Sequence, residues 1–194
     1  LYVRKFRRTE KRYVLLITCL STRAVHLEVS FTLDTDSLLM SLRRFFSRRG
    51  TPSVIWSDNG SSFVAGEKEL TQDLQSVDQD RMLDEMTKHS IKWVFNPPSA
   101  PHMGGSWERL VAAVKRPLRV VLGSSIVDDE VLLTVLCEVE FMVNSRPITY
   151  VSSDAHDFSP LTPNHFLLGY PCRGLPPSTV TSSDAIGKRK WRHA

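Results

Sequence analysis

The 194-residue sequence has few cysteines and no long hydrophobic run. Its three cysteines, Cys19, Cys137 and Cys172, lie far apart, and neither a C-x-x-C pair nor a zinc-finger spacing with the six histidines is present. This pattern disfavours a disulfide framework and a structural zinc site, and it favours a reducing intracellular setting over a secreted one. No apolar segment reaches the length of a membrane span, so we expect no membrane association.

An initiating methionine and a signal peptide are also lacking, because the chain begins with Leu1 and a basic cluster comes soon after. We therefore expect the sequence to be a piece of a longer protein. A formal net charge of +4 permits nucleic-acid binding without requiring it. The length and the 41% hydrophobic content suit one core, with or without a tail.

Hydrophobic periodicity predicts an α/β protein. Residues 13–20 form an apolar run typical of a strand buried on both faces, whereas residues 24–29 alternate like a half-buried strand. Residues 35–49 have a helical period, and Asp34 or Thr35 can cap the start of that helix. A charged turn is expected before the first of these strands, over residues 4–12.

The second half of the sequence continues the alternation. The Pro- and Gly-rich residues 97–106 indicate a loop, and Pro117 predicts a kink or an early end in the long helix that starts at Ser106. This order favours a mixed sheet with helices packed on it. We expect a core domain at residues 1–146 and a partly ordered, Pro/Ser/Thr-rich extension at residues 147–194. Strands are also expected at 53–56 and 91–95, and helices at about 66–75, 78–89 and 128–144.

The first candidate site residue is Asp58, in the sequence WSDNGSSF, where an apolar strand stops abruptly. Asp, Asn and Gly build tight turns for local backbone reasons, so one reading gives Asp58 only a turn. A carboxylate at a strand end is also suited to hold a divalent cation, which prefers hard oxygen ligands.

The second candidate is Glu108, near the start of the long helix in HMGGSWERLVAAVKRPLR. A glutamate in a first helical turn is commonly a capping-box residue. Ala112, Lys115 and Arg119 share its stripe, opposite the apolar stripe, and Arg116 flanks it. This stripe fits a solvated charged face. It fits equally a metal-binding carboxylate followed by cations that contact a phosphate backbone.

A strand end and a helix start can converge at one edge of an α/β fold. If Asp58 and Glu108 do so, two divalent cations about 3.5–4 Å apart could stabilise the attacking and leaving oxygens of phosphoryl transfer. A third carboxylate is usually needed for two ions, and composition alone does not identify it.

Three segments, taken together and in order, resemble the catalytic core of retroviral-type integrases, most closely those of Pao/BEL-type long-terminal-repeat retrotransposons. The segments are KRYVLLITCLSTRAVHLEV, FFSRRGTPSVIWSDNGSSF and NPPSAPHMGGSWERLV. The later NSRPITYVSSDAHDFSPLTPNHFLLG is similar to the region C-terminal to the core in those elements, so the resemblance covers nearly the whole chain. It implies a ribonuclease-H-like mixed sheet flanked by helices, with the first strand truncated and an extended C-terminal arm.

The resemblance also implies an Asp, Asp, Glu triad that binds two Mg²⁺ or Mn²⁺ ions. Asp58 matches the second acid and Glu108 the third. The first acid is expected a few residues before Leu1, since the first residues of this chain resemble the segment directly after that acid in the family. Asp34 and Asp36 come too late in the chain to replace it, and we expect them to cap the next helix instead.

The implied reaction is DNA 3′-end processing and strand transfer, in which water and then a DNA 3′-hydroxyl attack a phosphodiester. The implied partners are element and target DNA and further copies of the protein, and the implied location is the nucleus. A role for His102 as a catalytic base has no further support. The residues expected near DNA are Asn59 in the strand-end turn, His102, Gly104 and Gly105 in a flexible loop, and Lys115, Arg116 and Arg119 on the helix.

Two functions remain open. The chain is either an integrase core that is complete only in a longer parent, or a decayed or domesticated integrase-derived domain that binds DNA or a protein without catalysis. The presence of both Asp58 and Glu108 favours the first, since drift would be free to remove them. An unrelated α/β binding domain is disfavoured, because three motifs in the right order rarely coincide.

Overall fold

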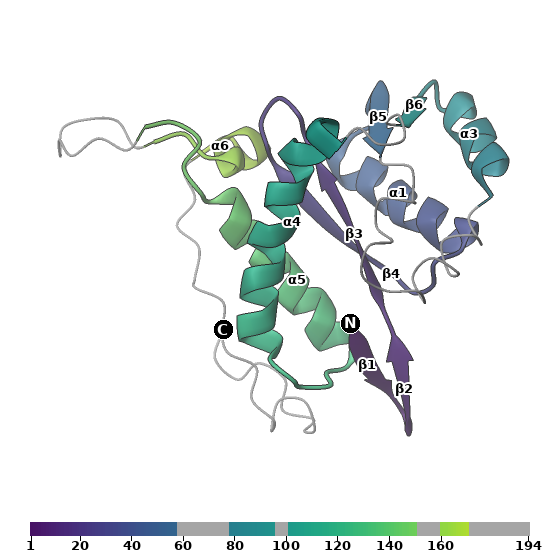
Figure 1. Cartoon of the computed structure of the whole chain (residues 1–194), viewed down its shortest axis with the longest axis vertical. Coiled ribbons are helices and arrows are strands. Elements are labelled where there is room, and N and C mark those ends of the chain that lie inside the picture. The colour runs from purple at the N-terminus through teal and green to yellow at the C-terminus, as the bar shows by residue number, and fades with distance from the viewer. Residues whose placement is uncertain (58–77, 96–100, 151–159, 171–194) are drawn as a thin grey trace. The chain divides into compact units, whose positions relative to one another are not determined.

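The computed structural model describes residues 1–57, 78–95, 101–150 and 160–170, with the backbone alone at 101–104 and 106 (Figure 1). The chain divides into two compact units. The first unit comprises residues 1–10, 16–27 and 107–194, and the second comprises residues 11–15 and 28–106.

From β3 to α5 the described strands and helices occur in the predicted order, which confirms the mixed α/β plan, whereas β2 and α6 were not predicted. Among the described residues the strands pair as three two-stranded sheets, β1–β2, β3–β4 and β5–β6, of which β5–β6 is parallel. A single ribonuclease-H-like sheet therefore stays a prediction, and the helix expected at 66–75 lies outside the described residues. The elements are β1 (Tyr2–Lys5), β2 (Arg8–Lys11), β3 (Tyr13–Thr18), β4 (Val25–Ser30), α1 (Thr35–Arg49), β5 (Val54–Ser57), α3 (Gln79–Lys88), β6 (Lys92–Phe95), α4 (Pro101–Leu122), α5 (Asp129–Asn144) and α6 (Pro163–Leu168).

The core of the first unit comes mainly from the apolar stripes of α4 and α5. Val3 of β1 is fully buried and forms a parallel bridge with Val127, and the Arg4 N–H donates to the Val127 carbonyl at 2.8 Å. Asp128 caps α5 by accepting from the Val131 N–H at 2.9 Å. The buried residues are Leu110, Val114, Leu118, Val121 and Leu122 of α4, and Val131, Leu132, Val135, Leu136, Val139 and Val143 of α5.

In the second unit, α1 begins and ends as predicted. The Asp34 carboxylate accepts from the Ser37 N–H at 2.7 Å, and the helix stops before Gly50, whose φ of 87° suits glycine. The start of α3 is fixed to the start of α1, since the Asp78 N–H donates to the Thr35 hydroxyl at 2.7 Å.

Two burial predictions are wrong. β3 is half-buried along its whole length instead of buried on both faces, and β4 is buried at all six positions instead of on one face. The alternating polar residues of β4 do not face water, because they have partners inside the protein. His26 Nδ1 lies 3.3 Å from Glu140 Oε2 in the first unit, and Arg44 Nε donates to Glu28 Oε2 at 2.8 Å in the second. Buried polar groups are tolerated when they are paired in this way.

The charged turn expected over residues 4–12 is also wrong. That segment forms the β1–β2 hairpin, with Phe6 and Arg7 alone in the turn. Phe6 adopts a positive φ of 55° and is 93% exposed.

Part of the predicted extension, α6, packs against α5 within the first unit. The Asn164 amide on α6 donates to the Phe141 carbonyl at 3.2 Å and to the Ser145 hydroxyl at 2.9 Å, both on α5 or its C-cap. The Ile148 N–H donates to the Leu161 carbonyl at 2.8 Å. The boundary at residue 147 stays a prediction. None of the described helices combines the length and apolarity needed to cross a bilayer.

Candidate functional site

The helix that carries the predicted site, α4, begins at Pro101, five residues before Ser106. The predicted loop is therefore wrong from residue 101 onward, and His102, Gly104 and Gly105 lie in a helix. Proline is favourable in a first helical turn, because the N–H that it lacks has no partner there. Each glycine costs only about 1 kcal/mol relative to alanine, which the burial of later turns offsets.

Gly105 has no structural reason to be glycine in this helix. A Cβ at this position would meet no atom within 4 Å, and its backbone does not require a positive φ. Position 105 therefore offers an open helix surface close to Glu108. A backbone without a side chain allows another molecule to approach closely.

Glu108 is the eighth residue of α4, and its side chain is exposed. The first turn of α4 contains no acidic residue. A capping-box glutamate must lie at the third helical position. The capping explanation for Glu108 is therefore wrong, and the solvated charged face and the metal ligand remain.

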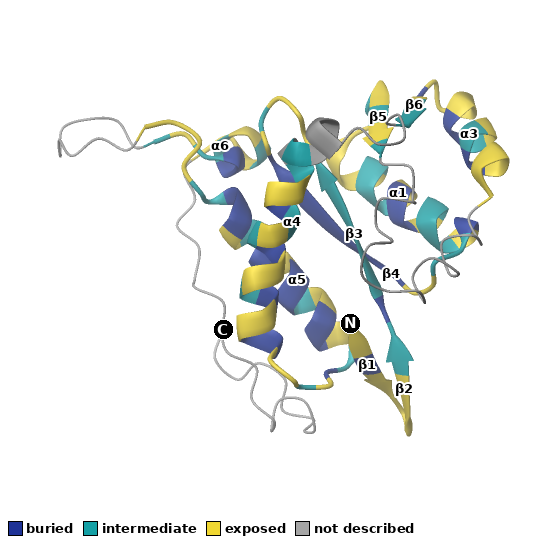
Figure 2. Ribbon diagram, in the orientation of Figure 1, coloured by how far each residue is buried: buried dark blue, intermediate teal, exposed yellow. Residues whose placement is uncertain are grey.

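The exposed face of α4 carries the predicted cations. Lys115, Arg116 and Arg119 are exposed together with Glu108, and the buried residues of the helix form a separate stripe. Figure 2 shows α4 with exposed and buried positions along its length. Arg109 is also exposed, and the sequence did not predict it because it lies outside the stripe of Glu108. The sequence could have indicated Arg109, because it lies seven residues before Arg116 and that spacing places both arginines on one side of the helix. Within the part of the chain that the structure describes, these five side chains form no hydrogen bond or ion pair.

Pro117 does not end α4, which continues to Leu122. The predicted early end is wrong, because the apolar residues after Pro117 are buried and hold the last turn. Leu118, Val121 and Leu122 each have exposed fractions of 7%. As a consequence Arg119 stays in helical register with Lys115 and Glu108.

Asp58 and Asn59 lie outside the described residues. β5 ends at Ser57, whose Cα pairs with that of Phe95 at the end of β6, and Trp93 Nε1 donates to Ser57 Oγ at 2.8 Å. Parallel strands end at the same edge of a sheet, so Ser57, which precedes Asp58, and Phe95 lie at one edge. From Phe95 to Pro101 the chain advances by about six residue steps, which can span at most about 22 Å. The convergence of Asp58 and Glu108 stays a prediction.

Asp34 and Asp36, the two other carboxylates considered in the sequence, already have protein partners. The Thr32 hydroxyl and then the Ser37 N–H donate to Asp34 and hold the pKa of its carboxyl below its usual value. Asp36 accepts from Arg81 at 2.6 Å. The capping prediction is confirmed for Asp34, which is the N-cap of α1. It is wrong for Asp36, whose carboxylate pairs with Arg81 of α3 instead.

Metal ligands are not assembled in the described residues, where no three His, Cys, Asp or Glu side chains gather. The exposed Glu108 carboxylate has no partner among the described residues and can accept a cation. Carboxylate oxygen is the hard donor that Mg²⁺ and Mn²⁺ prefer. Glu108 therefore fits one ligand of such a site, whose other ligands would include Asp58.

Comparison with solved structures shows an integrase-type fold. A chain of the cryoEM structure of the simian T-cell lymphotropic virus intasome in complex with PP2A regulatory subunit B56 gamma is similar, with a TM-score of 0.56 and 14% identity. The alignment covers 92% of this chain and 55% of that one, so this sequence spans about half the length of that chain. At this identity the likeness concerns the fold alone.

Two structures of the HTLV-2 integrase catalytic core domain in complex with magnesium, a trimeric and a dimeric form, align less well. Their TM-scores are 0.48 and 0.47, at 15% and 16% identity. The alignments cover 77% and 79% of this chain and 83% and 85% of theirs. No protein-family profile matches the sequence, and no curated protein is similar to it.

Proposed function

We propose that this chain is the catalytic core region of a retrotransposon integrase of the Pao/BEL type, with a ribonuclease-H-like core and a C-terminal arm. Its activity is metal-dependent 3′-end processing and strand transfer of DNA. The observation that carries the proposal is the exposed face of α4, where a carboxylate without a capping role precedes four cations that pair with no described residue, in an integrase-type fold.

Each residue of the site has a proposed role. Asp58 and Glu108 ligate two Mg²⁺ or Mn²⁺ ions together with an acid encoded ahead of Leu1. When bound, such ions stabilise the attacking and leaving oxygens of the phosphodiester. Asn59 shapes the turn that presents Asp58. Glu108 suits its role because a helix holds it rigidly and no described protein group competes for its oxygens.

The cations of α4 position the DNA. Lys115 and Arg119 lie about 6 Å apart along the helix axis, and Lys115 lies about 10.5 Å beyond Glu108. A DNA strand bound at Glu108 can therefore continue over these cations and place its phosphates beside them. Arg109 and Arg116 extend the positive surface sideways. His102, Gly104 and Gly105 form the helix start that lies nearest the reacting DNA. Further copies of the chain join on the DNA, in the nucleus.

A second candidate function is DNA or protein binding without catalysis, in a decayed or domesticated descendant of an integrase. The basic face of α4 supports it, because phosphate binding by this face needs neither Asp58 nor a metal ion.

The experiment that separates the two candidates uses protein expressed from the natural coding sequence, including any codons upstream of Leu1. Strand transfer of oligonucleotides that carry the element ends is measured with Mg²⁺ or Mn²⁺. The integrase proposal predicts joined products, their loss by at least about 10³-fold in Asp58→Asn and Glu108→Gln, and unchanged DNA affinity in both variants. Asp84→Asn, which removes another exposed helical carboxylate, serves as the matched control. DNA binding without joined products under any condition favours the second candidate.

A further inference from the structure

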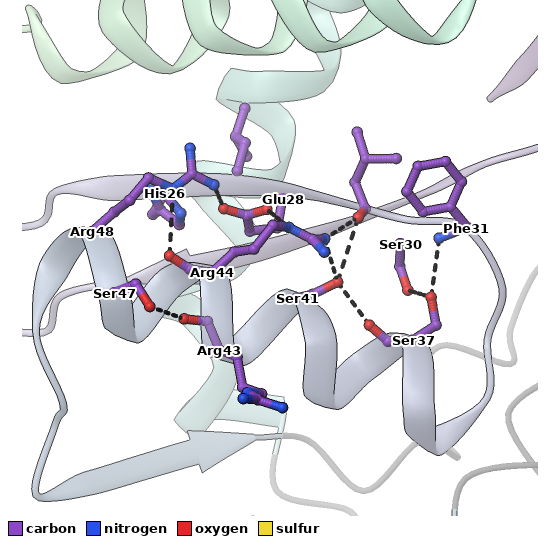
Figure 3. Close-up of polar contacts among 12 residues, drawn as sticks. His26, Glu28, Ser30, Phe31, Ser37, Ser41, Arg43, Arg44, Ser47 and Arg48 are labelled. Carbon is purple, nitrogen blue, oxygen red and sulfur yellow. Dashed lines mark hydrogen bonds and ion pairs between the residues drawn. The ribbon is translucent and has the colours of Figure 1, made fainter.

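An arginine-rich hollow lies on the surface of α1 in the second unit. It is an open surface depression of about 360 Å³, and we call it the α1 hollow. Its lining residues follow one another at helical spacing along α1, and Figure 3 labels Arg43, Arg44, Ser47 and Arg48 among them. They are Met40, Arg43, Arg44, Ser47 and Arg48.

A buried carboxylate fixes two of these arginines. The Glu28 side chain is only 3% exposed, and its two oxygens pair with Arg44, at 2.8 Å from Nε, and with Arg48 (Figure 3). Arg44 Nη2 also donates to the Val29 carbonyl at 2.6 Å. Burial of a carboxylate is costly unless it is paired, so these contacts hold the guanidinium groups in one orientation. The arginine side chains are nevertheless 41% and 51% exposed.

The hollow retains unused hydrogen-bond donors. A guanidinium has five N–H groups. Arg44 uses Nε and Nη2, which leaves both N–H groups of Nη1 without a partner in the described structure. Arg48 uses Nη2 toward Glu28 and Nε toward the Arg44 carbonyl at 3.4 Å. The Arg43 side chain forms no hydrogen bond or ion pair with any described residue, and in Figure 3 it points away from Glu28.

Positive charge in the hollow is only partly neutralised. Arg43, Arg44 and Arg48 bring three positive charges, and the buried Glu28 brings one negative charge. Glu85 of α3 also interacts electrostatically with Arg43, but its closest partner is Lys88. Arg44 and Arg48 are four residues apart, and such like-charged pairs destabilise a helix. A bound anion removes this repulsion and satisfies the unused donors.

The chemistry of the lining favours a phosphodiester. Guanidinium groups match phosphate oxygens in geometry and charge, and the Ser47 hydroxyl can donate to them as well. The side chain of Met40 is 54% exposed and offers an apolar surface for a sugar ring. Arg44 and Arg48 lie about 6 Å apart along the axis, which is comparable to the separation of neighbouring phosphates on a strand.

We propose that the α1 hollow is a second nucleic-acid contact, which binds the sugar-phosphate backbone independently of α4. The inference rests on the proposed function for its choice of a nucleic acid. It does not depend on Asp58, Glu108 or a metal ion. Arg44 and Arg48 are preorganised by Glu28, and Arg43 adds a third positive charge that no described contact fixes.

The test measures binding of single- and double-stranded 30-mer DNA by fluorescence anisotropy over a range of salt, without divalent metal. Arg43→Gln removes one cation without breaking an internal contact. Ser47→Glu places a carboxylate beside Arg43 and Arg44, where it competes with phosphate. Each variant is expected to weaken binding severalfold and to reduce the salt slope by about 1. Lys92→Gln, which removes one positive charge at an exposed position of β6, is the matched control and should leave the slope unchanged.

The α4 variant Lys115→Gln separates this proposal from the proposed function. If it lowers the slope while the α1 variants do not, the α1 proposal is overturned and the role of α4 stands. If only the α1 variants lower the slope, the α1 proposal stands and the DNA-binding role of Lys115 fails. Two further results overturn the α1 proposal. The first is that the α1 variants change self-association, measured by light scattering, but leave DNA affinity unchanged. The second is that polyglutamate of the same charge competes with DNA as well as unlabelled DNA does.

Discussion

The side-chain amide of Asn144 on α5 forms two hydrogen bonds with the backbone of Val25 in β4, each 2.7 Å long. The amide nitrogen donates to the Val25 carbonyl, and the Val25 N–H donates to the amide oxygen. One turn earlier on α5, Glu140 accepts from the Leu27 N–H at 2.8 Å. Side chains of a helix thus satisfy backbone groups of β4 that a neighbouring strand would otherwise pair.

Removal of the Asn144 amide should therefore destabilise the fold. In Asn144→Ala the buried N–H and C=O of Val25 lose their partners, and each unsatisfied group costs about 1–3 kcal/mol. We expect the free energy of unfolding to fall by about 2–4 kcal/mol in urea denaturation. Met142→Ala, at a 37% exposed position of the same helix, should cost clearly less. A loss below about 1 kcal/mol in Asn144→Ala would mean that water satisfies Val25.

The buried Glu28 carboxylate gives a second stability prediction. Glu28→Gln keeps the shape of the side chain and removes the charge that faces Arg44 and Arg48. We expect a loss of about 1–3 kcal/mol, since the two guanidinium groups are half-exposed and partly rehydrate. Glu85→Gln is the matched control, because Glu85 pairs with Lys88 at 2.8 Å on the surface and such pairs contribute less than about 1 kcal/mol. Equal losses in the two variants would contradict the role of Glu28.

Asp34 predicts a dependence of stability on pH. Its folded-state pKa lies below the unfolded value, because the Thr32 hydroxyl and the Ser37 N–H bind the charged form. The stabilisation is therefore fully present above the unfolded pKa of about 3.9, and it is lost as the pH falls through the lower folded pKa. Asp34→Asn keeps a good helix cap and removes the titration. The difference in unfolding free energy between wild type and Asp34→Asn should shrink below about pH 4. A difference that stays constant with pH would show that Asp34 ionisation does not stabilise the fold.

The contact of α6 with α5 predicts local stability in the extension. Asn164→Ala removes the donors to the Phe141 carbonyl and the Ser145 hydroxyl. Hydrogen exchange of residues 163–168 should become faster, with exchange in the core of α5 unchanged. Phe166→Ala, at a 54% exposed position of the same helix, is the control. Unchanged protection in Asn164→Ala would show that other contacts hold α6.

Helices with clear caps were predictable from the sequence, and the burial of β3 and β4 was not. Asp34, Asp78 and Asp128 each accept from the N–H three residues later, and the apolar period determined the rest of those helices. The burial of β4 depends on partners such as Glu140 and Arg44, which lie far away in the sequence. Alternation alone cannot reveal a polar residue that is paired inside the protein.

The candidate site was also predictable only in part. The face that joins Glu108, Lys115 and Arg119 was predictable from helical spacing alone. The start of α4 was not predictable, because a Gly-Gly pair after a proline is typical of loops. These residues are helical because the later turns of α4 are buried, and that burial offsets the cost of the glycines. Arg109 was missed for a simpler reason, since it lies outside the stripe that contains Glu108.

The most direct test of the central claim, that Asp58 and Glu108 share one metal site, is backbone cleavage by bound iron. Fe²⁺ replaces Mg²⁺ at hard-oxygen sites, and with ascorbate and peroxide it cuts the chain close to where it is bound. The protein expressed from its natural coding sequence should be cut near residues 58 and 108, and Glu108→Gln should abolish both cuts. Cuts that persist in Glu108→Gln, or that fall near only one of the two residues, would contradict a shared site.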